Sequence, residues 1–471
     1  MSSIKNNLDM FFNPRNVAIV GVSRNTRKFG HVIFKNFLES SINANIYPVN
    51  PNTDEILGRK CYKSLLEIPG QLDLVILAVA SRYVLNSMRE CAQKKVRGVI
   101  IIAGGFSEIG EEGKKLENEV LRIAEQNNIR IIGPNVIGIY DPYSGVDTLF
   151  LPRYRLLRPK KGSIAFISQS GAFGSALLDF AASRGVGISK FVSIGNAIDI
   201  DAIDILEYLE QDPNTQCIMM YLEGIKPKEG REFLKIIRRI TLKKPIILLK
   251  GGLTPQGQKA AASHTGSISS QIEILQAVIK QTGVLQAEDA LQLFDMARIL
   301  AASPLPKGEG IAIITNAGGF GVLTTDQLVK KGYNLAKLDK KTIEILKSRM
   351  PAAVIVSNPT DLVGDADTER YKIALDTILA DPNVHVVIVI ILLSLSYVES
   401  DIIDVINDAR VRSGKPIVVT TIGGDFTRIM VRMMEENQIP TFPNPKRTVD
   451  AVKALLDYKD ICERKEECDL V

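Results

Sequence analysis

The stretch GQKAAASHTGSIS, residues 257–269, places one titratable ring in a run of small residues. His264 is one of three histidines in 471 residues, and its neighbours are Ala, Ser, Thr and Gly. An imidazole in such a loop could serve as a metal ligand, a general base or a phosphoryl carrier. His31 and His385 lie elsewhere in the sequence and no cysteine or acidic cluster adjoins the loop, which disfavours a metal site. We therefore favour a histidine that accepts and carries a phosphoryl group.

A nucleophilic serine is the competing chemistry. Ser170 in SQSGAFG resembles the serine of a G-x-S-x-G elbow only loosely, because Ser168 stands at the first glycine position. The same stretch belongs to an internal repeat: IAFISQSGAFGSALLDFAASRG at 164–185 aligns with IAIITNAGGFGVLTTDQLVKKG at 311–332. Each copy predicts a strand, a turn of small residues and a helix start. The two copies are either ordinary βα units or two helix N-termini that hold an anion through free N–H groups.

The elements that position these residues are short Val- and Ile-rich runs that alternate with helical stretches. NVAIVGVS, LDLVILAVA, PIILLKGG and HVVIVIILL are apolar throughout and do not alternate with polar residues. Such runs are typical of parallel strands covered on both faces. A length of 471 residues is too long for one core. We predict an α/β fold of three doubly wound parallel-sheet domains, with boundaries at 1–147, 148–303 and 304–471.

Composition narrows the function classes. The chain is 45% hydrophobic and 24% charged, and its net charge of +5 is spread without a basic block, which disfavours nucleic-acid binding. No signal-peptide core opens the sequence and no apolar run reaches the roughly 18 residues of a membrane span. The five cysteines form no CxxC pair, which favours a reducing, cytoplasmic location.

The first predicted domain carries a strand–turn–helix segment at 16–30 that is not a nicotinamide fingerprint. Its glycines do not follow G-x-G-x-x-G, and the second strand, NIYPVNP, ends in Asn50 where a nicotinamide site needs Asp or Glu. The turn is basic instead, with Arg24, Arg27 and Lys28. These side chains suit a ligand with extra phosphates, such as coenzyme A, or form a solvated basic turn.

Six motifs in order resemble the α chain of NDP-forming acyl-CoA synthetases, relatives of succinyl-CoA synthetase. The motifs lie between residues 167 and 362 and are ISQSGAFG, SIGNAIDID, YLEGI, KGGLTPQGQKAAASHTGS, ITNAGGFG and NPTDL. The resemblance covers essentially the whole chain in order. The resemblance implies a Rossmann-like CoA-binding domain followed by two flavodoxin-like ligase domains. It also implies an acid–thiol ligase of the ADP-forming acetate–CoA ligase type. The reaction would convert acyl-CoA, phosphate and ADP reversibly into a carboxylic acid, CoA and ATP, through an acyl phosphate and a phosphohistidine.

The same resemblance assigns roles to individual residues. His264 would be the phosphorylated nucleophile, and Glu223 in YLEGI would orient it. The phosphate-binding residues would be Ser168, Gln169, Ser170, Gly171 and Ala172, with Asn316, Ala317, Gly318 and Gly319 from the repeat. The CoA-binding residues would be Gly21, Ser23, Arg24, Lys28, Ala103, Gly104 and Gly105. No protein metal site is implied.

The nucleotide site is expected on another chain, because no Walker-type loop occurs in this sequence. The resemblance implies an ATP-grasp β subunit that binds Mg²⁺ with ADP or ATP, in an α₂β₂ assembly. The alternatives are a non-catalytic CoA-binding regulator and an NAD(P)-linked oxidoreductase. The acyl group, the choice between ADP and GDP, and the effect of Val136 where the family commonly has Cys stay open. So does Asp361, which could position a ligand or serve the turn.

Overall fold

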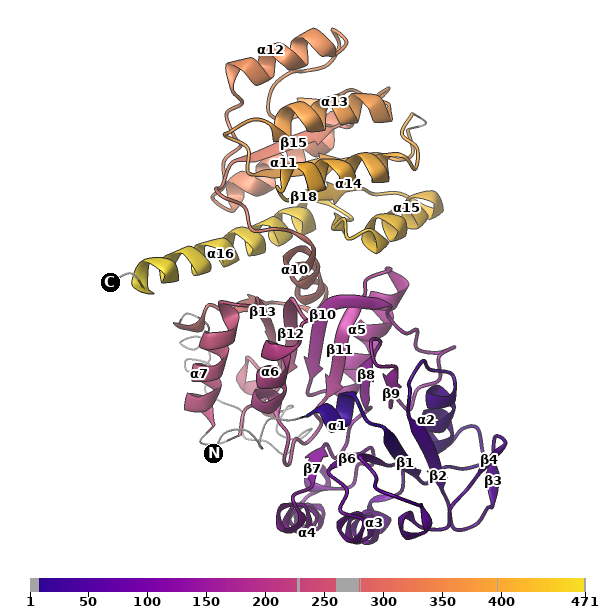
Figure 1. Cartoon of the computed structure of the whole chain (residues 1–471). Coiled ribbons are helices and arrows are strands. Elements are labelled where there is room, and N and C mark those ends of the chain that lie inside the picture. The colour runs from indigo at the N-terminus through magenta and orange to yellow at the C-terminus, as the bar shows by residue number, and fades with distance from the viewer. Residues whose placement is uncertain (1–7, 227–228, 260–278, 280, 396, 470–471) are drawn as a thin grey trace. The chain divides into compact units, whose positions relative to one another are not determined.

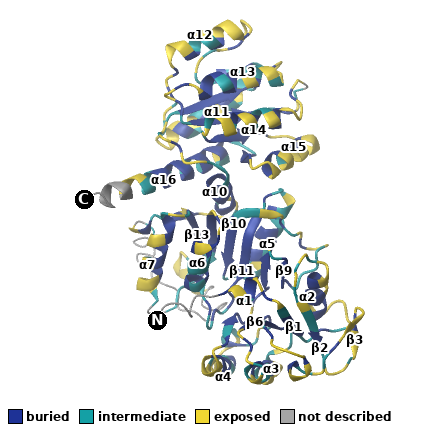
Figure 2. Ribbon diagram, viewed as in Figure 1, coloured by how far each residue is buried: buried dark blue, intermediate teal, exposed yellow. Residues whose placement is uncertain are grey.

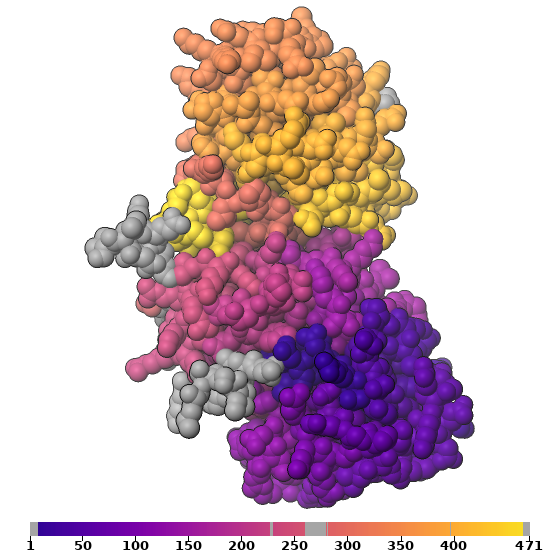
Figure 3. Space-filling view, viewed as in Figure 1, coloured from indigo at the N-terminus to yellow at the C-terminus, as the bar shows by residue number. Residues whose placement is uncertain are grey.

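The computed structural model describes residues 8–226, 229–259, 279, 281–395 and 397–469, and His264 lies outside these ranges. The chain divides into two compact units, Met1–Ser183 with Gly187–Gln286 and Arg184–Val186 with Ala287–Val471. Figure 1 shows their elements and Figure 3 their space-filling surfaces. The first unit holds two large sheets and the second unit holds one.

The first sheet has five parallel strands in the order β2-β1-β5-β6-β7. Both β5 and β6 are buried along their whole length, as their unbroken apolar sequences predict. The strands are β1 Asn16–Val20, β2 Asn45–Val49, β5 Leu74–Leu77, β6 Gly98–Ile101 and β7 Arg130–Ile132. The helices are α1 Asp9–Phe12, α2 Phe29–Leu38, α3 Ser81–Gln93 and α4 Glu111–Asn127, and a small hairpin pairs β3 Glu55–Ile56 with β4 Arg59–Lys60.

The second sheet has seven strands in the order β14-β13-β12-β10-β11-β8-β9. Its central strands are parallel, and β8 pairs with β11 in the antiparallel sense. The strands are β8 Ile139–Asp141, β9 Val146–Asp147, β10 Lys161–Ser168, β11 Ile188–Ser193, β12 Cys217–Leu222, β13 Ile246–Lys250 and β14 Leu285–Ala287. The described helices are α5 Gly171–Ser183, α6 Ala202–Gln211 and α7 Gly230–Thr241. Residues 139–147, which precede the predicted boundary, thus extend this second sheet.

The third sheet has five parallel strands in the order β16-β15-β17-β18-β19. The strands are β15 Ile311–Thr315, β16 Thr360–Asp361, β17 Val386–Ile390, β18 Ile417–Thr420 and β19 Thr441–Phe442. The helices are α10 Ala290–Ala302, α11 Gly318–Lys330, α12 Lys340–Arg349, α13 Thr368–Leu379, α14 Ile402–Ser413, α15 Asp425–Glu436 and α16 Pro445–Asp469.

The parallel strands of the three sheets follow one topology. The second strand in chain order lies on one side of the first, and the third strand lies on the other side. The connections therefore diverge at the carboxyl ends of the first and third strands, where open α/β sheets bind their ligands. These switch points lie between β1 and β5, between β10 and β12, and between β15 and β17. The predicted site residues follow these strands.

One hydrophobic core joins the first two sheets. It contains α1, whose Phe12 is fully buried and stacks on Tyr208 of α6 with ring centroids 4.9 Å apart. Burial of such a side chain contributes about 1.5–3 kcal/mol. Arg130 at the start of β7 donates to Asp199 over 2.9 Å, which adds a polar link between the sheets. Figure 2 shows the buried strands as dark blue inside each unit.

Candidate active site

The ends of β10 and β12 bring Gln169 and Glu223 together at the switch point of the second sheet. Gln169 follows β10, and its backbone N–H donates to the carbonyl of Tyr221 over 3.0 Å. Its side-chain Oε1 accepts from the backbone N–H groups of Glu223 at 2.7 Å and of Gly224 at 3.2 Å. The side chain of Gln169 therefore fixes the loop that carries Glu223.

Glu223 is only 6% exposed as a residue, and its carboxylate has polar neighbours. The phenol of Tyr221 donates to Glu223 Oε1 over 3.3 Å, and Lys250 Nζ donates to the Glu223 carbonyl over 2.7 Å. Burial lowers the pKa of Lys250, although the charge of Glu223 opposes this. Burial, followed by the charge of Glu223, raises the pKa of Tyr221 to about 12. A carboxylate oriented in this way can fix the tautomer of an imidazole.

A glycine lets the chain pass close to this carboxylate after β13. At Gly251 a Cβ would lie 2.7 Å from Tyr221 Oη and 3.4 Å from Glu223 Cγ. Only glycine fits such an approach without displacing the neighbours. The predicted nucleophile His264 follows thirteen residues later in the sequence and lies outside the described residues. The contact between His264 and Glu223 stays a prediction.

The helix α5 begins beside Glu223 with the predicted phosphate-binding residues. Ser168 Oγ donates to the carbonyl of Ser170 over 2.7 Å, and Ser170 Oγ accepts from Phe173 N over 3.3 Å. The helical ladder starts only at Gly174, whose N–H donates to Ser170. The N–H groups of the first turn thus face out of the helix end, as in any anion-binding N-terminus.

The surroundings of this helix start are apolar. At Gly171 a Cβ would lie 2.6 Å from Ile137 Cγ2, and at Gly174 it would lie 2.8 Å from the ring of Phe191. Ala172, next to Gly171, is exposed. A phosphate at this turn would therefore have backbone N–H groups on one side and the hydrocarbon wall of Ile137 on another.

The repeat at β15 and α11 reproduces the same hydrogen bonds. Thr315 Oγ1 donates to the carbonyl of Ala317 over 3.0 Å, as Ser168 does to Ser170. Asn316 Oδ1 accepts from the backbone N–H of Leu392 over 2.9 Å, as Gln169 does from Glu223. The repeated sequence thus forms a repeated structure, but Leu392 stands where the first copy has its carboxylate.

A second difference separates the two turns. The carboxylate of Asp361 lies against Gly318, where a Cβ would collide with its Oδ2, while Gly319 faces open space. Asp361 Oδ1 also accepts from the N–H of Val363 over 3.0 Å, so the residue serves the turn. A carboxylate at a helix N-terminus interacts favourably with the helix dipole. It also repels a second anion there, so the α5 turn is the better phosphate site.

The first sheet shows what the side chain of Asn50 does directly after β2. Gly21 has φ +93°, and a Cβ there would lie 2.5 Å from the carbonyl oxygen of Ala78 at the end of β5. Asn50 Nδ2 donates to the carbonyl of Val22 over 2.6 Å, and Asn50 Oδ1 accepts from Asn52 N over 2.8 Å. The amide fixes the turn after β1 through a donor that an acidic residue would lack.

The polar residues of that turn have different environments. Ser23 Oγ accepts from Asn25 N, and the carbonyl of Ser23 lies 2.7 Å from Nδ1 of His31. His31 therefore ties the turn to the first helical turn of α2. Arg24 donates to the carbonyl of Glu55 over 3.4 Å, and Lys28 is exposed at the residue before α2.

A polar cluster that the sequence did not reveal supports the predicted turn Ala103-Gly104-Gly105. Glu108 Oε1 accepts from Gly105 N over 2.5 Å, and Glu108 Oε2 accepts from Asn196 Nδ2 over 2.7 Å. Burial raises the pKa of Glu108, but the bonds from Asn196 and Gly105 outweigh it and leave the pKa below its ordinary value. Because Asn196 follows β11, Glu108 links this turn, predicted to bind CoA, to the second sheet.

Val136 packs in the core instead of facing the crevice. It is 2% exposed, and its Cγ1 lies 2.7 Å from the position of a Cβ at Gly195.

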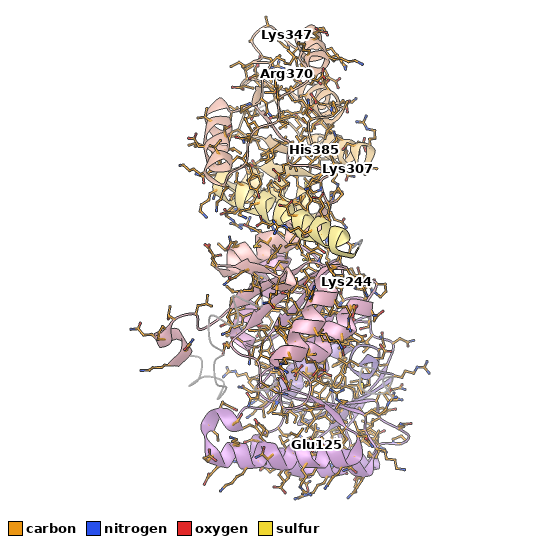
Figure 4. The ribbon with its side chains drawn as sticks, turned by 90° about the vertical axis from the view of Figure 1, so that its left-hand side faces the viewer. Glu125, Lys244, Lys307, Lys347, Arg370 and His385 are labelled. Atoms are coloured by element: carbon orange, nitrogen blue, oxygen red, sulfur yellow. The ribbon has the colours of Figure 1, made fainter. Side chains whose placement is uncertain are left out.

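His385, labelled in Figure 4, lies against Gly308 and Gly310 at the start of β17. Among the residues described, no three His, Cys, Asp or Glu side chains converge as a metal site requires. Within the same residues, no helix has the length and apolar character to cross a membrane.

Comparison with known proteins decides the family. Three family models match in order: a CoA binding domain at 15–142, a succinyl-CoA ligase like flavodoxin domain at 161–300 and a ligase-CoA domain at 311–459. A relative from Pyrococcus furiosus, acetate–CoA ligase [ADP-forming] II subunit alpha, is 41% identical over 95% of this chain and 97% of its own. The chain belongs to the family of ADP-forming acetate–CoA ligases. The resemblance inferred from the sequence, the α/β fold and the acid–thiol ligase class are confirmed, and the non-catalytic alternative is not favoured.

Two further members of the family are informative. Acetyl-coenzyme A synthetase 1 from Ca. Korarchaeum cryptofilum, solved in complex with phosphate and ADP, is 34% identical. It superimposes with a TM-score of 0.90 over 98% of this chain and 99% of that chain. Acetate–CoA ligase [ADP-forming] from Methanocaldococcus jannaschii is 39% identical over 97% of this chain but only 64% of its own length. In that relative, about a third of its own length thus lies outside the part that this chain matches.

Proposed function

We propose that this chain is the α subunit of an ADP-forming acyl-CoA synthetase that works with an ATP-grasp β subunit. The observation that carries the proposal is the pairing at the second switch point. There, Gln169 holds the buried Glu223 beside the start of α5, and the chain leaves β13 toward His264. The Pyrococcus furiosus relatives, both named as α subunits, support the need for a partner.

In the first step the α5 turn would hold phosphate beside the thioester of acyl-CoA. A phosphate oxygen attacks the carbonyl carbon, the C–S bond breaks, and CoA leaves as the thiolate. The backbone N–H groups around Gly171 and Ala172 would stabilise the phosphate charge through the helix dipole. Ile137 would border the acyl group, since it lies directly over Gly171.

In the second step His264 would attack the phosphorus of the acyl phosphate. The P–O bond to the acyl group breaks and the carboxylic acid leaves as its carboxylate. Glu223 would accept the hydrogen bond of the other ring nitrogen, which directs the free nitrogen toward phosphorus and stabilises the positive charge that develops. The phosphoryl group would then pass to ADP on the partner, where Mg²⁺ accompanies the nucleotide.

The CoA site proposed for the first domain is formed by the turns after β1 and β6. Gly21 and Gly105 let the two turns pack closely against the neighbouring chain, because a Cβ would strike Ala78 at the first position and Ser81 at the second. Arg24 and Lys28 would pair with phosphates of CoA. We also propose three domains as predicted, with residues 139–147 assigned to the second domain, an α₂β₂ assembly and a cytoplasmic location.

An acyl-CoA-dependent assay of ATP formation tests the proposal. The chain is mixed with its ATP-grasp partner, Mg-ADP, phosphate and a panel of acetyl-, branched-chain and aryl-acyl-CoA. We expect ATP with at least one acyl-CoA, and none when either chain is omitted. ATP formation by this chain alone would contradict the division of labour. If no acyl-CoA gives ATP but a thermal-shift panel of CoA, NAD and NADP shows tight binding of CoA, the alternative of a non-catalytic CoA-binding regulator is favoured.

A further inference from the structure

Lys250 ends β13 as a buried ammonium group between two backbone carbonyls. The residue is 7% exposed, and its Nζ donates to the Glu223 carbonyl over 2.7 Å and to the Gly251 carbonyl. A buried ammonium is costly unless an opposite charge offsets it, and two neutral carbonyls supply no such charge. The carboxylate of Glu223 supplies one, because its charge acts on the pKa of Lys250 against the larger effect of burial.

The second copy of the internal repeat lacks both of these charged residues. The segment KPIILLK, which ends at Lys250, aligns with KPIVVTT, which ends at Thr421. The strand pairing agrees with this alignment, since β13 pairs with β12 as β18 pairs with β17. Glu223 aligns in the same way with Leu392. One copy thus has the lysine and the glutamate together, and the other copy has neither.

The carbonyl that Lys250 holds has a neutral donor in the second copy. There, the carbonyl of Leu392 accepts from Asn316 Nδ2 over 3.4 Å. Thr421 is buried, and its hydroxyl has no hydrogen-bond partner among the residues that the structure describes. The fold therefore needs no ammonium to fix this carbonyl or to end this strand. The lysine accompanies the carboxylate of Glu223 instead.

Lys244, directly before β13, shows how a lysine with a structural role differs. Lys244, labelled in Figure 4, donates through Nζ to two backbone carbonyls over 2.7 and 2.8 Å. The aligned Lys415 of the second copy also donates to two backbone carbonyls, over 2.7 and 2.9 Å. Both copies of the repeat thus have this lysine, whether or not a carboxylate follows the neighbouring strand. Lys250 occurs only in the copy that has Glu223.

We infer that Lys250 is a positioning residue for phosphoryl transfer, which holds the backbone of Glu223 and balances the charge of its carboxylate. The inference rests on the proposed function and adds a residue to it. In that function a phosphoryl group would reach His264 beside Glu223, and two negative groups at close range repel each other. The ammonium would reduce this repulsion. It also holds the carbonyl of Gly251, from which the chain continues toward His264.

The test is Lys250→Gln in the full chain, because glutamine removes the charge and keeps an N–H donor for the Glu223 carbonyl. Single-turnover labelling of the chain from acyl-CoA and phosphate measures the rate, and calorimetry measures CoA affinity. We expect labelling to slow by about 10-fold or more, with CoA affinity unchanged. The matched control is Lys244→Gln, which removes the same charge at the other end of β13 and should label at the wild-type rate.

A double-mutant cycle shows whether Lys250 acts through Glu223. In a chain that already carries Glu223→Gln, the added Lys250→Gln should slow labelling by less than about 3-fold, because the charge that it balances is gone. Equal slowing in both backgrounds would overturn the inference. Labelling at the wild-type rate in Lys250→Gln would overturn it too, as would equal slowing by Lys244→Gln.

Thermal unfolding tests the charge pair without any phosphoryl transfer. Lys250→Thr alone leaves the buried carboxylate without the charge of Lys250, whereas Glu223→Leu combined with Lys250→Thr copies the second repeat. We expect the double variant to unfold at a higher temperature than Lys250→Thr alone. A melting temperature at or below that of Lys250→Thr would overturn the pairing. Absence of label from the wild-type chain would count against the proposed function, and the melting temperatures would still test the charge pair.

Discussion

The substitution Gln169→Met tests whether one amide positions Glu223, the carboxylate proposed to orient His264. Methionine keeps the length of the side chain and removes Oε1, which accepts from Glu223 N at 2.7 Å and Gly224 N at 3.2 Å. A buried N–H left without an acceptor costs about 1–3 kcal/mol. Because both hydrogen bonds are only partly buried, we take the lower part of that range for each N–H group. The two groups together should then cost about 2–3 kcal/mol of unfolding free energy. At roughly 2–4 °C per kcal/mol, the melting temperature should fall by about 4–12 °C.

The functional effect of Gln169→Met should exceed its effect on stability. A displacement of about 1 Å in a catalytic group can cost 10²-fold in rate, so phosphorylation from acyl-CoA and phosphate should slow by about that factor. Single-turnover labelling in a quench-flow apparatus measures the rate, and scanning calorimetry measures the melting temperature. The control is Asn36→Leu, which removes a buried bond from Asn36 to the Leu149 carbonyl in the same unit and should slow nothing. Labelling at the wild-type rate in Gln169→Met would refute the positioning role.

Three further predictions follow from other contacts. Glu223→Gln should retain the fold and CoA affinity but slow single-turnover phosphorylation by about 10²–10⁴; a wild-type rate would leave Glu223 a structural residue. Gly21→Ala should weaken CoA binding in calorimetry by about 10-fold or more, whereas Gly58→Ala, at φ +72° with nothing within 4 Å of a Cβ, should not. The pKa of Tyr221 is raised from 10 to about 12, so the folded chain holds that proton longer than the unfolded chain and stability should fall as pH rises from 10 toward 12. Denaturant unfolding should show a shallower fall in Tyr221→Phe, and identical slopes would contradict the assignment.

The strands and the repeat could be predicted from the sequence because their signals are local. Unbroken apolar runs predicted buried parallel strands, and the repeat predicted that Ser168 and Thr315 start equivalent turns, as their matching bonds confirm. The contact between Gln169 and Glu223 was not predicted. It depends on β10 and β12 being neighbours, which the structure shows.

Other features depend on strand order and loop paths, which no local pattern encodes. Lys250 was not singled out, although the last residue of a strand beside β12 must lie near Glu223. Asn50 was used only to argue against a nicotinamide site, because its bond to Val22 joins the loops after two strands whose pairing the sequence does not show. Glu108 was not singled out, because its role depends on the bond to Asn196 that connects two sheets. The position of Asp361 against Gly318 could not be predicted either, since β16 and α11 are far apart in sequence.

We propose that His264, oriented by Glu223, carries the phosphoryl group. The most direct measurement incubates the chain with acyl-CoA and labelled phosphate, digests it and maps the label by mass spectrometry. The account predicts an acid-labile, base-stable phosphate on the peptide that contains His264, and no label in His264→Ala although CoA still binds within a few-fold. A label on another residue, or undiminished labelling of His264→Ala, would contradict the account.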